Sequence, residues 1–360
     1  MTLKWALPLV QGRGAGLGNE LVPWVRAHLI AQAVGAHCLP PAFGLNSRRY
    51  WRHFGTPRLD WAAHRALCAA LPRVHFGEQD WLAHGGGDVV HAFARFAEQH
   101  RLPARSAFAL TTDGMWGGMP HIEAGRDFAR SVLYQSRFAA RNLARIHQRL
   151  DPALPVVGIH VRLGDFAAAQ PAEAYRGRFN VSLPMAWYRR VALSLQQQLD
   201  GQVQFLVVSD AKSSQLGELT NDLRCVFTDD LPDSDCSDLL ALSRADLMVC
   251  AVSSYSVWAA FLSEAPYLWF EPNLTEAGEG WQGIWAHEPG QKQSSSFMQR
   301  ALAELRGAEP VSPTRAWSVP MTGEVAPQAI RQMQARRAHR ATDLIRYGLV
   351  PSASAGEGAR

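Results

Sequence analysis

The sequence predicts an α/β protein with two Rossmann-like domains that face each other across a cleft, and three observations point to this class. A chain of 360 residues is too long for one ordinary core and suits two domains of about 150 residues each. Its 47% hydrophobic and 19% charged residues are typical of globular proteins. In the second half, short apolar runs alternate with helical stretches of roughly 10 to 15 residues, as in βαβ units with a parallel sheet.

We expect residues 1–150 to form an N-terminal α/β domain and residues 151–305 a C-terminal α/β domain. Residues 306–360 are expected to form a helical extension followed by a disordered tail, since the last residues are small and polar. A helix over about 122–150, continuous or broken, would join the two halves.

The second half has the clearest pattern, because each expected strand is a short apolar run that ends at polar residues. The expected strands are 155–161, 203–208, 225–227, 246–252 and 267–270. The expected helices between them are 184–199, 213–223, 237–244 and 255–263. Parallel sheets bind ligands at the carboxyl ends of their strands, so the residues after each strand are the candidates for function.

The first half opens in the same way, with an expected strand at 5–10, a glycine-rich loop at 11–19 and a helix at 20–34. A short strand at 37–39 follows. Residues 46–118 are rich in tryptophan, histidine and arginine, and their periodicity is too weak to assign elements.

Charge and length exclude some partners. The net charge of +4 permits an anionic ligand, but the arginines are scattered, unlike the clustered stripe of a nucleic-acid binder. The densest basic run, 334–340, is interpreted as a solvated helix face. No stretch has the roughly 20 apolar residues of a membrane span, so we expect a soluble protein whose membrane association, if any, is peripheral.

The five cysteines form no C-x-x-C pair, which favours reduced thiols in a cytoplasmic protein. The N-terminal apolar run is too short for a signal peptide. The thirteen histidines show neither an H-x-x-x-H pair with a nearby carboxylate nor a neighbouring cysteine pair, so no metal site and no cofactor is expected.

The segment 160–165 carries the first candidate site. His160 and Arg162 project from one face of a strand, because side chains alternate with a period of two. An arginine at a strand end, followed by Gly164, suits a phosphate oxygen. Asp165 would hold either side chain in place. An internal ion pair between Arg162 and Asp165 that only fixes the turn explains the same residues.

Three further segments follow strands and have plainer alternatives. Glycines around Gly16 and Gly18, with Asn19, would let backbone N–H groups approach an anion, although a tight turn without a ligand is an equal interpretation. Ser209 and Asp210 would contact a nucleotide, or Asp210 would cap a helix. Ser253, Ser254, Tyr255 and Ser256 open a helix, and N-capping alone accounts for one serine. A diphosphate ligand held without a metal satisfies all of these segments.

These motifs resemble a known family. Residues 160–165 resemble the H-x-R-R-G-D motif of the alpha-1,2-fucosyltransferases and of the related alpha-1,6- and protein O-fucosyltransferases. Residues 238–246 and 253–262 are similar to the family's second signature, an acidic D-x-x-L-M-S-type helix before N-S-S-F-S-W-W. Residues 16–20 are similar to its G-x-L-G-N-Q opening, and 180–188 to the segment ahead of its L-x-Y-Y helix. Together they cover about two thirds of the chain in the family's order.

The resemblance implies a GT-B architecture, GDP-fucose as the donor, inversion at the anomeric carbon and no metal. It implies that residues 1–150 form the acceptor side and residues 151–305 the donor domain. By this resemblance, Arg162 would bind the β-phosphate, Asp165 would support the loop that carries Arg162, and His160 would orient the guanine or the first phosphate. Asp210 and Asp238 would face the nucleoside. The diphosphate would lie near Ser253, Ser254 and Tyr255, and the donor would be covered by Gly18 and Asn19 of the first domain. Leu163, Val252, Tyr255 and Val257 depart from the pattern.

The expected function is therefore transfer of fucose to a glycan or glycoconjugate. Another sugar nucleotide such as GDP-mannose, a catalytically idle sugar-nucleotide-binding protein and, least favoured, an arginine-rich nucleic-acid binder are the alternatives. The candidate general bases are Asp165, Glu20 and His160, and the sequence does not choose between them. The tryptophans of the middle region are either an acceptor platform or core residues: Trp51, Trp61, Trp81 and Trp116.

Overall fold

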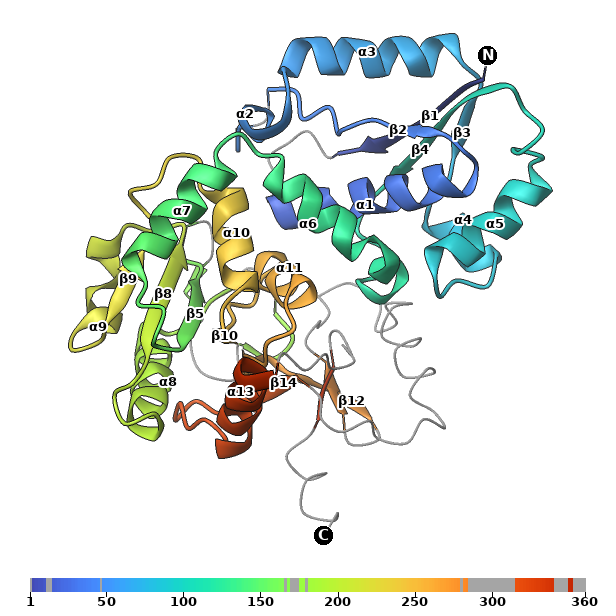
Figure 1. Cartoon of the computed structure of the whole chain (residues 1–360). Helices are drawn as coiled ribbons and strands as arrows, with labels where there is room; N and C mark the ends of the chain where they lie inside the picture. Colours follow the sequence, from blue (N-terminus) through green and yellow to red (C-terminus); the bar gives the residue numbers. More distant parts are fainter. Residues whose placement is uncertain are drawn as a thin grey trace. The chain divides into compact units, whose positions relative to one another are not determined.

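The computed structural model describes residues 2–10, 15–45, 47–164, 167–168, 175–178, 181–278, 281–283, 315–339 and 349–351. The chain consists of two compact units, Met1–Ala139 and Ala140–Arg360 (Figure 1). The α/β class predicted from the sequence is confirmed, since each unit contains a parallel β-sheet with helices.

The second unit is built on a six-stranded parallel sheet. Its strands, in spatial order, are β9 (Cys225–Phe227), β8 (Gln204–Ser209), β5 (Val156–Val161), β10 (Leu247–Val249), β11 (Tyr267–Phe270) and β14 (Ala316–Val319). Along the chain this is the order 3-2-1-4-5-6 of a Rossmann sheet. The order reverses between β5 and β10, so a crevice for a ligand is expected at their carboxyl ends.

The helices of the second unit connect these strands and are shorter at the β8–β9 crossover than elsewhere. They are α7 (Ala139–Arg149), α8 (Met185–Gln198), η3 (Ser213–Leu216), α9 (Gly217–Thr220), α10 (Asp235–Ser243), α11 (Ser254–Leu262), η4 (Glu271–Asn273) and α13 (Pro327–His339). Two small sheets accompany them, one of β6 (Ala167–Ala168) and β7 (Val181–Ser182) and one of β12 (Thr275–Gly278), β13 (Trp281–Gly283) and β15 (Leu349–Pro351).

Close packing of α10 on β5 depends on Gly158. A Cβ atom at Gly158 would lie 3.0 Å from the side chains of both Ala245 and Leu242, which is tighter than ordinary van der Waals contact. The absence of a side chain therefore lets α10 approach the centre of the sheet. Apolar residues of the core surround it, among them Val157, Ile159 and Phe205, which are entirely buried.

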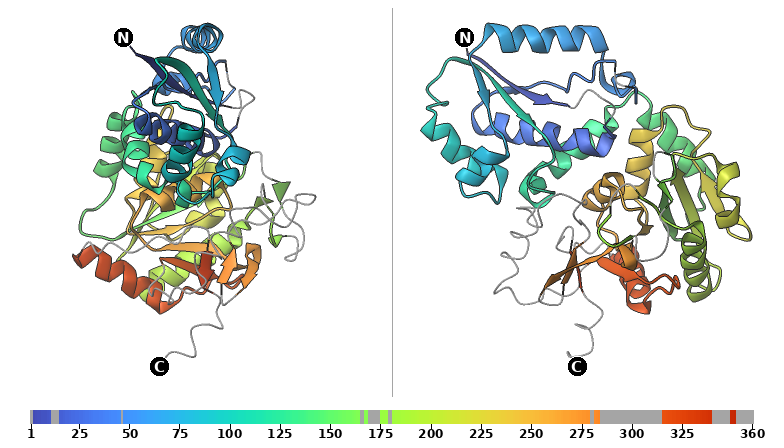
Figure 2. Two further views of the ribbon diagram at one scale, coloured as in Figure 1. Left: turned by 90° about the vertical axis from the view of Figure 1, so that its right-hand side faces the viewer. Right: turned by 180° about the vertical axis from the view of Figure 1, so that it is seen from behind.

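The first unit has a four-stranded parallel sheet. The spatial order is β2 (His37–Cys38), β1 (Leu3–Leu9), β4 (Ala107–Asp113) and β3 (Arg73–His75), and β1 pairs with β4 over all seven residues. The helices are α1 (Leu17–Ala33), α2 (Trp51–Phe54), α3 (Pro57–Ala70), α4 (Glu78–Ala83), α5 (Val89–Gln99), η1 (Pro120–Gly125) and α6 (Arg126–Tyr134). Helix α1 lies on one face of the sheet and α3 on the other (Figures 1 and 2).

Several expectations need correction. The middle region, 46–118, contains the strands β3 and β4, and β4 is the main partner of β1. The C-terminal stretch, 306–360, adds β14 to the edge of the large sheet as well as helix α13, while the expected disordered end, 352–360, lies outside the described residues. The helix expected over 122–150 takes the broken form that the sequence allowed, as η1, α6 and α7.

The second unit begins earlier than the boundary predicted at residue 150, because α7 belongs to it. The side-chain amide of Asn142 donates to the backbone oxygen of Pro232 at 2.9 Å and to the hydroxyl of Ser237 at 3.2 Å. At the other end of α7, the Arg149 guanidinium pairs with Asp230. These contacts fasten α7 to the start of α10 and to the loop after β9.

Candidate functional site

Most of the predicted site residues lie together at the carboxyl ends of β5, β8 and β10 in the second unit's sheet. Arg162 follows β5, Asp210 follows β8, and Ser253 follows β10. These three strands are neighbours in the sheet, with β5 in the middle. The site therefore coincides with the switch point of the strand order, where ligands bind in Rossmann sheets.

Asp210 clamps the loop that follows β5. Its carboxylate accepts hydrogen bonds from the backbone N–H groups of Leu163 and Gly164, both at 2.9 Å, and Oδ2 forms an ion pair with Arg162 Nη1 at 3.0 Å. The register explains the contact, because Val161 lies opposite Ser209 and the next residues of the two strands come together. Asp210 is thus neither a helix cap nor remote from the motif.

Gly164 is required by this clamp. A Cβ atom built on Gly164 would lie 2.3 Å from Asp210 Oδ2, where no heavy atom fits. The side chains of Arg162 and Asp210 are 18% and 24% exposed, so the charged pair is partly accessible to a ligand. The alternative partner of Arg162 considered from the sequence, Asp165, lies outside the described residues.

His160 joins β5 to α11. Its Nδ1 atom lies 2.7 Å from the hydroxyl oxygen of Ser256, and its ring centroid lies 5.0 Å from that of Tyr255. Burial, with a smaller contribution from the Arg162 charge, lowers the pKa of His160 to about 3. A group with so low a pKa stays neutral near pH 7 and is a poor general base. We interpret His160 as a positioning residue for the first turn of α11.

The N-terminus of α11 is held by its own side chains. The Ser253 hydroxyl accepts hydrogen bonds from the backbone N–H groups of Tyr255, at 3.2 Å, and Ser256, at 3.5 Å. The Tyr255 hydroxyl donates to the backbone oxygen of Asp235 at 2.5 Å and so ties α11 to α10. Ser254 is half-buried in the same turn. Ser253 therefore does act as an N-cap, while Ser256 and Tyr255 fix the helix in the site.

On the β8 side, Ser209 accepts a hydrogen bond from the backbone N–H of Ala211 at 3.0 Å. Its hydroxyl thereby closes the turn that carries Asp210. The half-buried side chain of Ser209 has a local structural role, which the sequence did not reveal.

Asp238 is buried in the first turn of α10, with 5% of its surface exposed. The Ser234 hydroxyl donates to its Oδ2 atom at 2.7 Å, and Thr228 also contributes a hydrogen bond. Burial nevertheless outweighs these donors and raises the pKa of Asp238 to about 8. The carboxyl is thus largely protonated near pH 7 and holds the loop between β9 and α10. Ser234 and Thr228 are site partners that no sequence motif indicated.

The raised pKa gives Asp238 a testable signature. The folded protein keeps the Asp238 proton that the unfolded chain releases near pH 4. The contribution of this proton to the free energy of unfolding is therefore complete below about pH 4 and is lost as the pH rises towards 8. Asp238→Asn keeps a neutral side chain at every pH. We expect the free energy of unfolding of this variant to exceed that of the wild type by an amount that grows between about pH 4 and 8. Above pH 8 the difference between the two proteins should stay constant.

Urea unfolding at a series of pH values measures this difference. Asp200→Asn, at an exposed position, is the matched control and should follow the wild type. If Asp238→Asn tracks the wild-type profile, the carboxyl is ionised in the folded protein. Nucleotide affinity of the same variant tests separately whether Asp238 contacts the ligand.

The predicted residues of the first unit lie at the start of α1. Gly16 is its N-cap and offers no side-chain acceptor, while the N–H of Leu17 donates to the Tyr50 hydroxyl at 2.8 Å. The N–H of Asn19 donates to the backbone oxygen of Gly16 at 2.9 Å. Gly18 and Glu20 are buried. Gly12 and Gly14 of the preceding loop lie outside the described residues.

The sequence did not indicate that an arginine of α1 is buried against the residues at the carboxyl end of β4. Arg26, entirely buried in α1, donates to the backbone oxygens of Asp113 at 2.7 Å and Trp116 at 3.0 Å, and its guanidinium lies 3.3 Å from the centre of the Trp116 ring. His121 Nε2 accepts from Arg26 Nε at 3.1 Å. Among the four tryptophans of the middle region, Trp81 and Trp116 are core residues, whereas Trp61 is 50% exposed.

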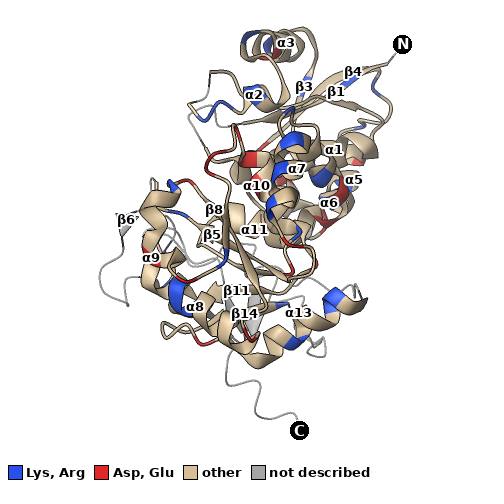
Figure 3. Ribbon diagram, turned by 60° about the vertical axis from the view of Figure 1, so that its left-hand side comes forward, with Lys and Arg blue, Asp and Glu red and all other residues tan. Residues whose placement is uncertain are grey.

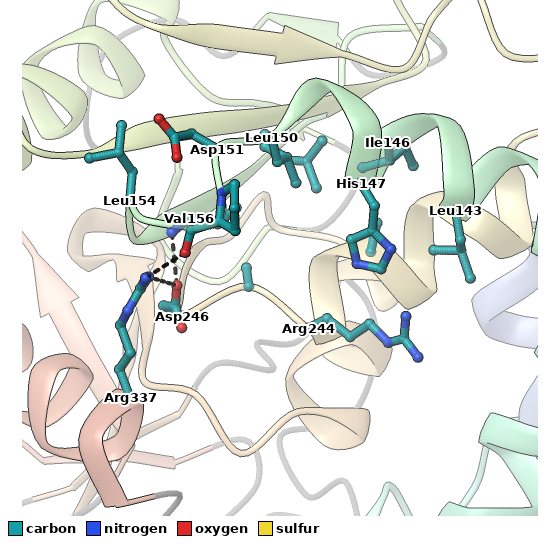
Figure 4. Close-up of a pocket in the computed structure, with 14 residues that line it drawn as sticks. Leu143, Ile146, His147, Leu150, Asp151, Leu154, Val156, Arg244, Asp246 and Arg337 are labelled. Carbon is teal, nitrogen blue, oxygen red and sulfur yellow. Dashed lines mark hydrogen bonds and ion pairs between the residues drawn. The ribbon is translucent and has the colours of Figure 1, made fainter.

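A pocket of about 430 Å³ lies at the amino-terminal ends of β5 and β10 in the second unit's sheet (Figure 4). It borders Val156, the first residue of β5, and Asp246, which precedes β10. Arg337 reaches in from α13 and pairs with Asp246 at 3.0 Å, so the basic run 334–340 is partly engaged and not only a solvated face. Ligands of such sheets bind at the carboxyl ends of the strands, so this pocket is not the candidate site.

None of the five cysteines forms a disulfide. Within the described ranges, no group of three or more His, Cys, Asp or Glu side chains is arranged to hold a metal ion. Nor does any helix there combine the length and the apolar character that crossing a bilayer requires.

No protein-family model and no curated protein matches the sequence. Among solved structures, the chain is similar to the fucosyltransferase NodZ from Bradyrhizobium, with 12% identity, a TM-score of 0.44, and 72% of this chain and 94% of that chain covered. It is also similar to POFUT1 in complex with GDP-fucose, with 12% identity, a TM-score of 0.40, and coverages of 72% and 96%. Because the TM-scores are below 0.5, the function is inferred from the chain's own residues.

Proposed function

We propose that this chain is an inverting, metal-independent glycosyltransferase of the GT-B type that transfers fucose from GDP-fucose to a glycan acceptor. The observation that carries the proposal is the position of Arg162. It stands at the switch point of a Rossmann sheet, fixed by Asp210 and partly exposed. A guanidinium in that place suits the diphosphate of a sugar nucleotide. The order of the motifs around it supports a fucosyltransferase-like family.

Arg162 would act on the leaving group. As the bond between the anomeric carbon and the β-phosphate oxygen breaks, negative charge develops on the diphosphate. A fixed cation stabilises that charge most when it is already in place, because no reorganisation is then needed during the reaction. Asp210 supplies this preorganisation through its contacts to Arg162, Leu163 and Gly164. The N-terminus of α11, next to the same strand ends, adds a favourable dipole.

The acceptor hydroxyl would attack the anomeric carbon from the face opposite the leaving GDP, through an oxocarbenium-like transition state. The new bond joins the acceptor oxygen to that carbon, and the hydroxyl proton passes to a base or to water. Of the candidate bases, His160 is disfavoured by its lowered pKa, and Glu20 is buried in α1. Asp165 keeps its place as a candidate from the sequence.

Leu163 keeps one alternative donor open. The family motif has a second arginine at this position, and a leucine removes one contact to the phosphate or guanine. A transferase for GDP-mannose or another sugar nucleotide would use the same Arg162 clamp. A catalytically idle binding protein would keep nucleotide affinity without turnover.

Thermal unfolding with a panel of nucleotides tests the proposal. GDP, UDP, ADP and their fucose, mannose and glucose conjugates are compared in the presence of EDTA. A ligand at 100 times its dissociation constant stabilises a protein by about 2.7 kcal/mol, so a GDP-selective rise in Tm is expected. GDP-fucose turnover is then measured with and without EDTA. A folded protein that no guanine nucleotide stabilises contradicts the proposal, and stabilisation without any turnover points to the idle binding protein.

A further inference from the structure

Helix α3 presents an apolar stripe to the outside of the first unit. None of its 14 residues is buried. Six of them are exposed apolar residues at the i, i+3, i+4 and i+7 spacings that place side chains on one helix face: Leu59, Ala62, Ala63, Ala66, Ala69 and Ala70. Such a stripe normally faces a core, yet Leu59 is 71% exposed. No described element of this unit lies on the outer side of α3 (Figures 1 and 2).

A basic and aromatic row runs beside this stripe. Arg58, Trp61 and Arg65 are spaced by three and four residues, so they share the neighbouring face of the helix. Trp61 is 50% exposed, and the Arg65 guanidinium lies 4.6 Å from the centre of its ring. Tryptophan and arginine at the border of an apolar helix face are typical of helices that lie in a membrane interface.

The segment around α3 has an excess of positive charge. Residues 36–77 contain six arginines and one carboxylate, Asp60, while the whole chain has a net charge of only +4. Figure 3 shows basic residues on both α2 and α3. Leu45, close in sequence to Arg48 and Arg49, is 74% exposed. Exposed apolar side chains and clustered arginines therefore occur together in this part of the first unit.

We propose that α3 and the residues just before it form a docking surface for an anionic lipid bilayer. Leu45, Leu59 and Trp61 would enter the headgroup region, and the arginines would contact lipid phosphates. A nucleic acid offers no apolar layer to receive three large exposed side chains. A second copy of the chain would bring the same positive charge against this face. An anionic membrane satisfies both the charge and the apolar area.

Vesicle sedimentation with the full chain tests this surface. We expect binding to phosphatidylcholine vesicles that contain phosphatidylglycerol, loss of binding in high salt, and little binding to phosphatidylcholine alone. Each arginine near an anionic surface contributes about fivefold to partitioning, so Arg58→Gln with Arg65→Gln should lower it about 25-fold. Leu59→Ser with Trp61→Ser should also lower it, through the apolar contribution.

The matched control combines Arg105→Gln, in the same unit, with Leu193→Ser on α8, where the leucine is 37% exposed. It removes one charge and one apolar group outside the surface and should bind vesicles almost as the wild type does. All altered side chains are exposed, and far-UV circular dichroism checks that each variant is folded.

Three results would overturn the proposal. The first is equal binding to both vesicle types, or none to either. The second is a concentration-dependent dimer that Leu59→Ser with Trp61→Ser abolishes, since it assigns the stripe to self-association. The third is salt-sensitive binding of RNA or DNA that the arginine variants abolish while vesicle binding is unchanged. Nucleotide turnover is measured in parallel, so failure of this proposal is distinct from failure of the proposed function.

Discussion

Arg162→Ala is expected to lower kcat for sugar transfer by about 10²–10³-fold, which is the usual loss when one preorganised donor to a developing negative charge is removed. The side chain is 18% exposed, pairs with Asp210 and follows the end of β5, so its removal should leave the sheet intact. The measurement is steady-state kinetics with GDP-fucose, together with the Tm of the variant.

Two comparisons separate catalysis from structure. Arg162→Lys keeps the charge but not the planar guanidinium, so it should recover part of the lost rate. Arg189→Ala removes another arginine of the same unit, one that donates to backbone oxygens of Glu218 and Asn221, and should leave kcat unchanged. An Arg162→Ala enzyme with normal kcat and a lowered Tm would show that the residue only anchors its loop.

Arg26→Met is expected to lower the free energy of unfolding by about 3–5 kcal/mol, the largest effect on stability that we predict. The guanidinium is entirely buried, and its loss leaves the backbone oxygens of Asp113, Gly114 and Trp116 without their donor. Each buried polar group left unsatisfied costs about 1–3 kcal/mol. Methionine fills much of the volume, so the loss reports hydrogen bonding more than packing.

The loss of unfolding free energy is measured by urea or thermal unfolding, with a spectroscopic probe that reports on the first unit. Arg65→Ala on the exposed side of α3 is the control and should change stability by less than about 0.5 kcal/mol. A change below about 1 kcal/mol for Arg26→Met would mean that water or a rearranged loop satisfies the three oxygens.

The sequence predicted the second unit well because its signals are local. In the large sheet, the strands β5, β8, β9, β10 and β11 are apolar runs that end at polar residues, and the ends of these strands were the candidate site. The partners of those residues could not be predicted. Asp210 reaches Gly164 through the β5–β8 register, and His160 reaches Ser256 across 96 residues. Contacts of that kind depend on which strands are neighbours, and a local pattern carries no such information.

The first unit was predicted less well, for different physical reasons. Strand β4, Ala107–Asp113, begins with alanine and ends at an Asp-Gly turn, a signal hidden among irregular tryptophans and histidines. Arg26 looks like an ordinary surface residue of an amphipathic helix, because its acceptors lie 86–95 residues later. The apolar spacing of α3 was present in the sequence, but only burial distinguishes a core face from an exposed one.

The pairing of β1 with β4 has a consequence for biosynthesis. Leu3 lies opposite Ala107 and Leu9 opposite Asp113, so the first strand finds its main partner only about 100 residues later in the chain. Until the ribosome has released that partner, β1 has one short neighbour, β2, with which it pairs at two positions. Closing so long a loop costs entropy before any contact is gained, which makes folding slow. The nascent N-terminal half therefore displays an unpaired apolar strand edge for several seconds of synthesis, the kind of segment that chaperones bind.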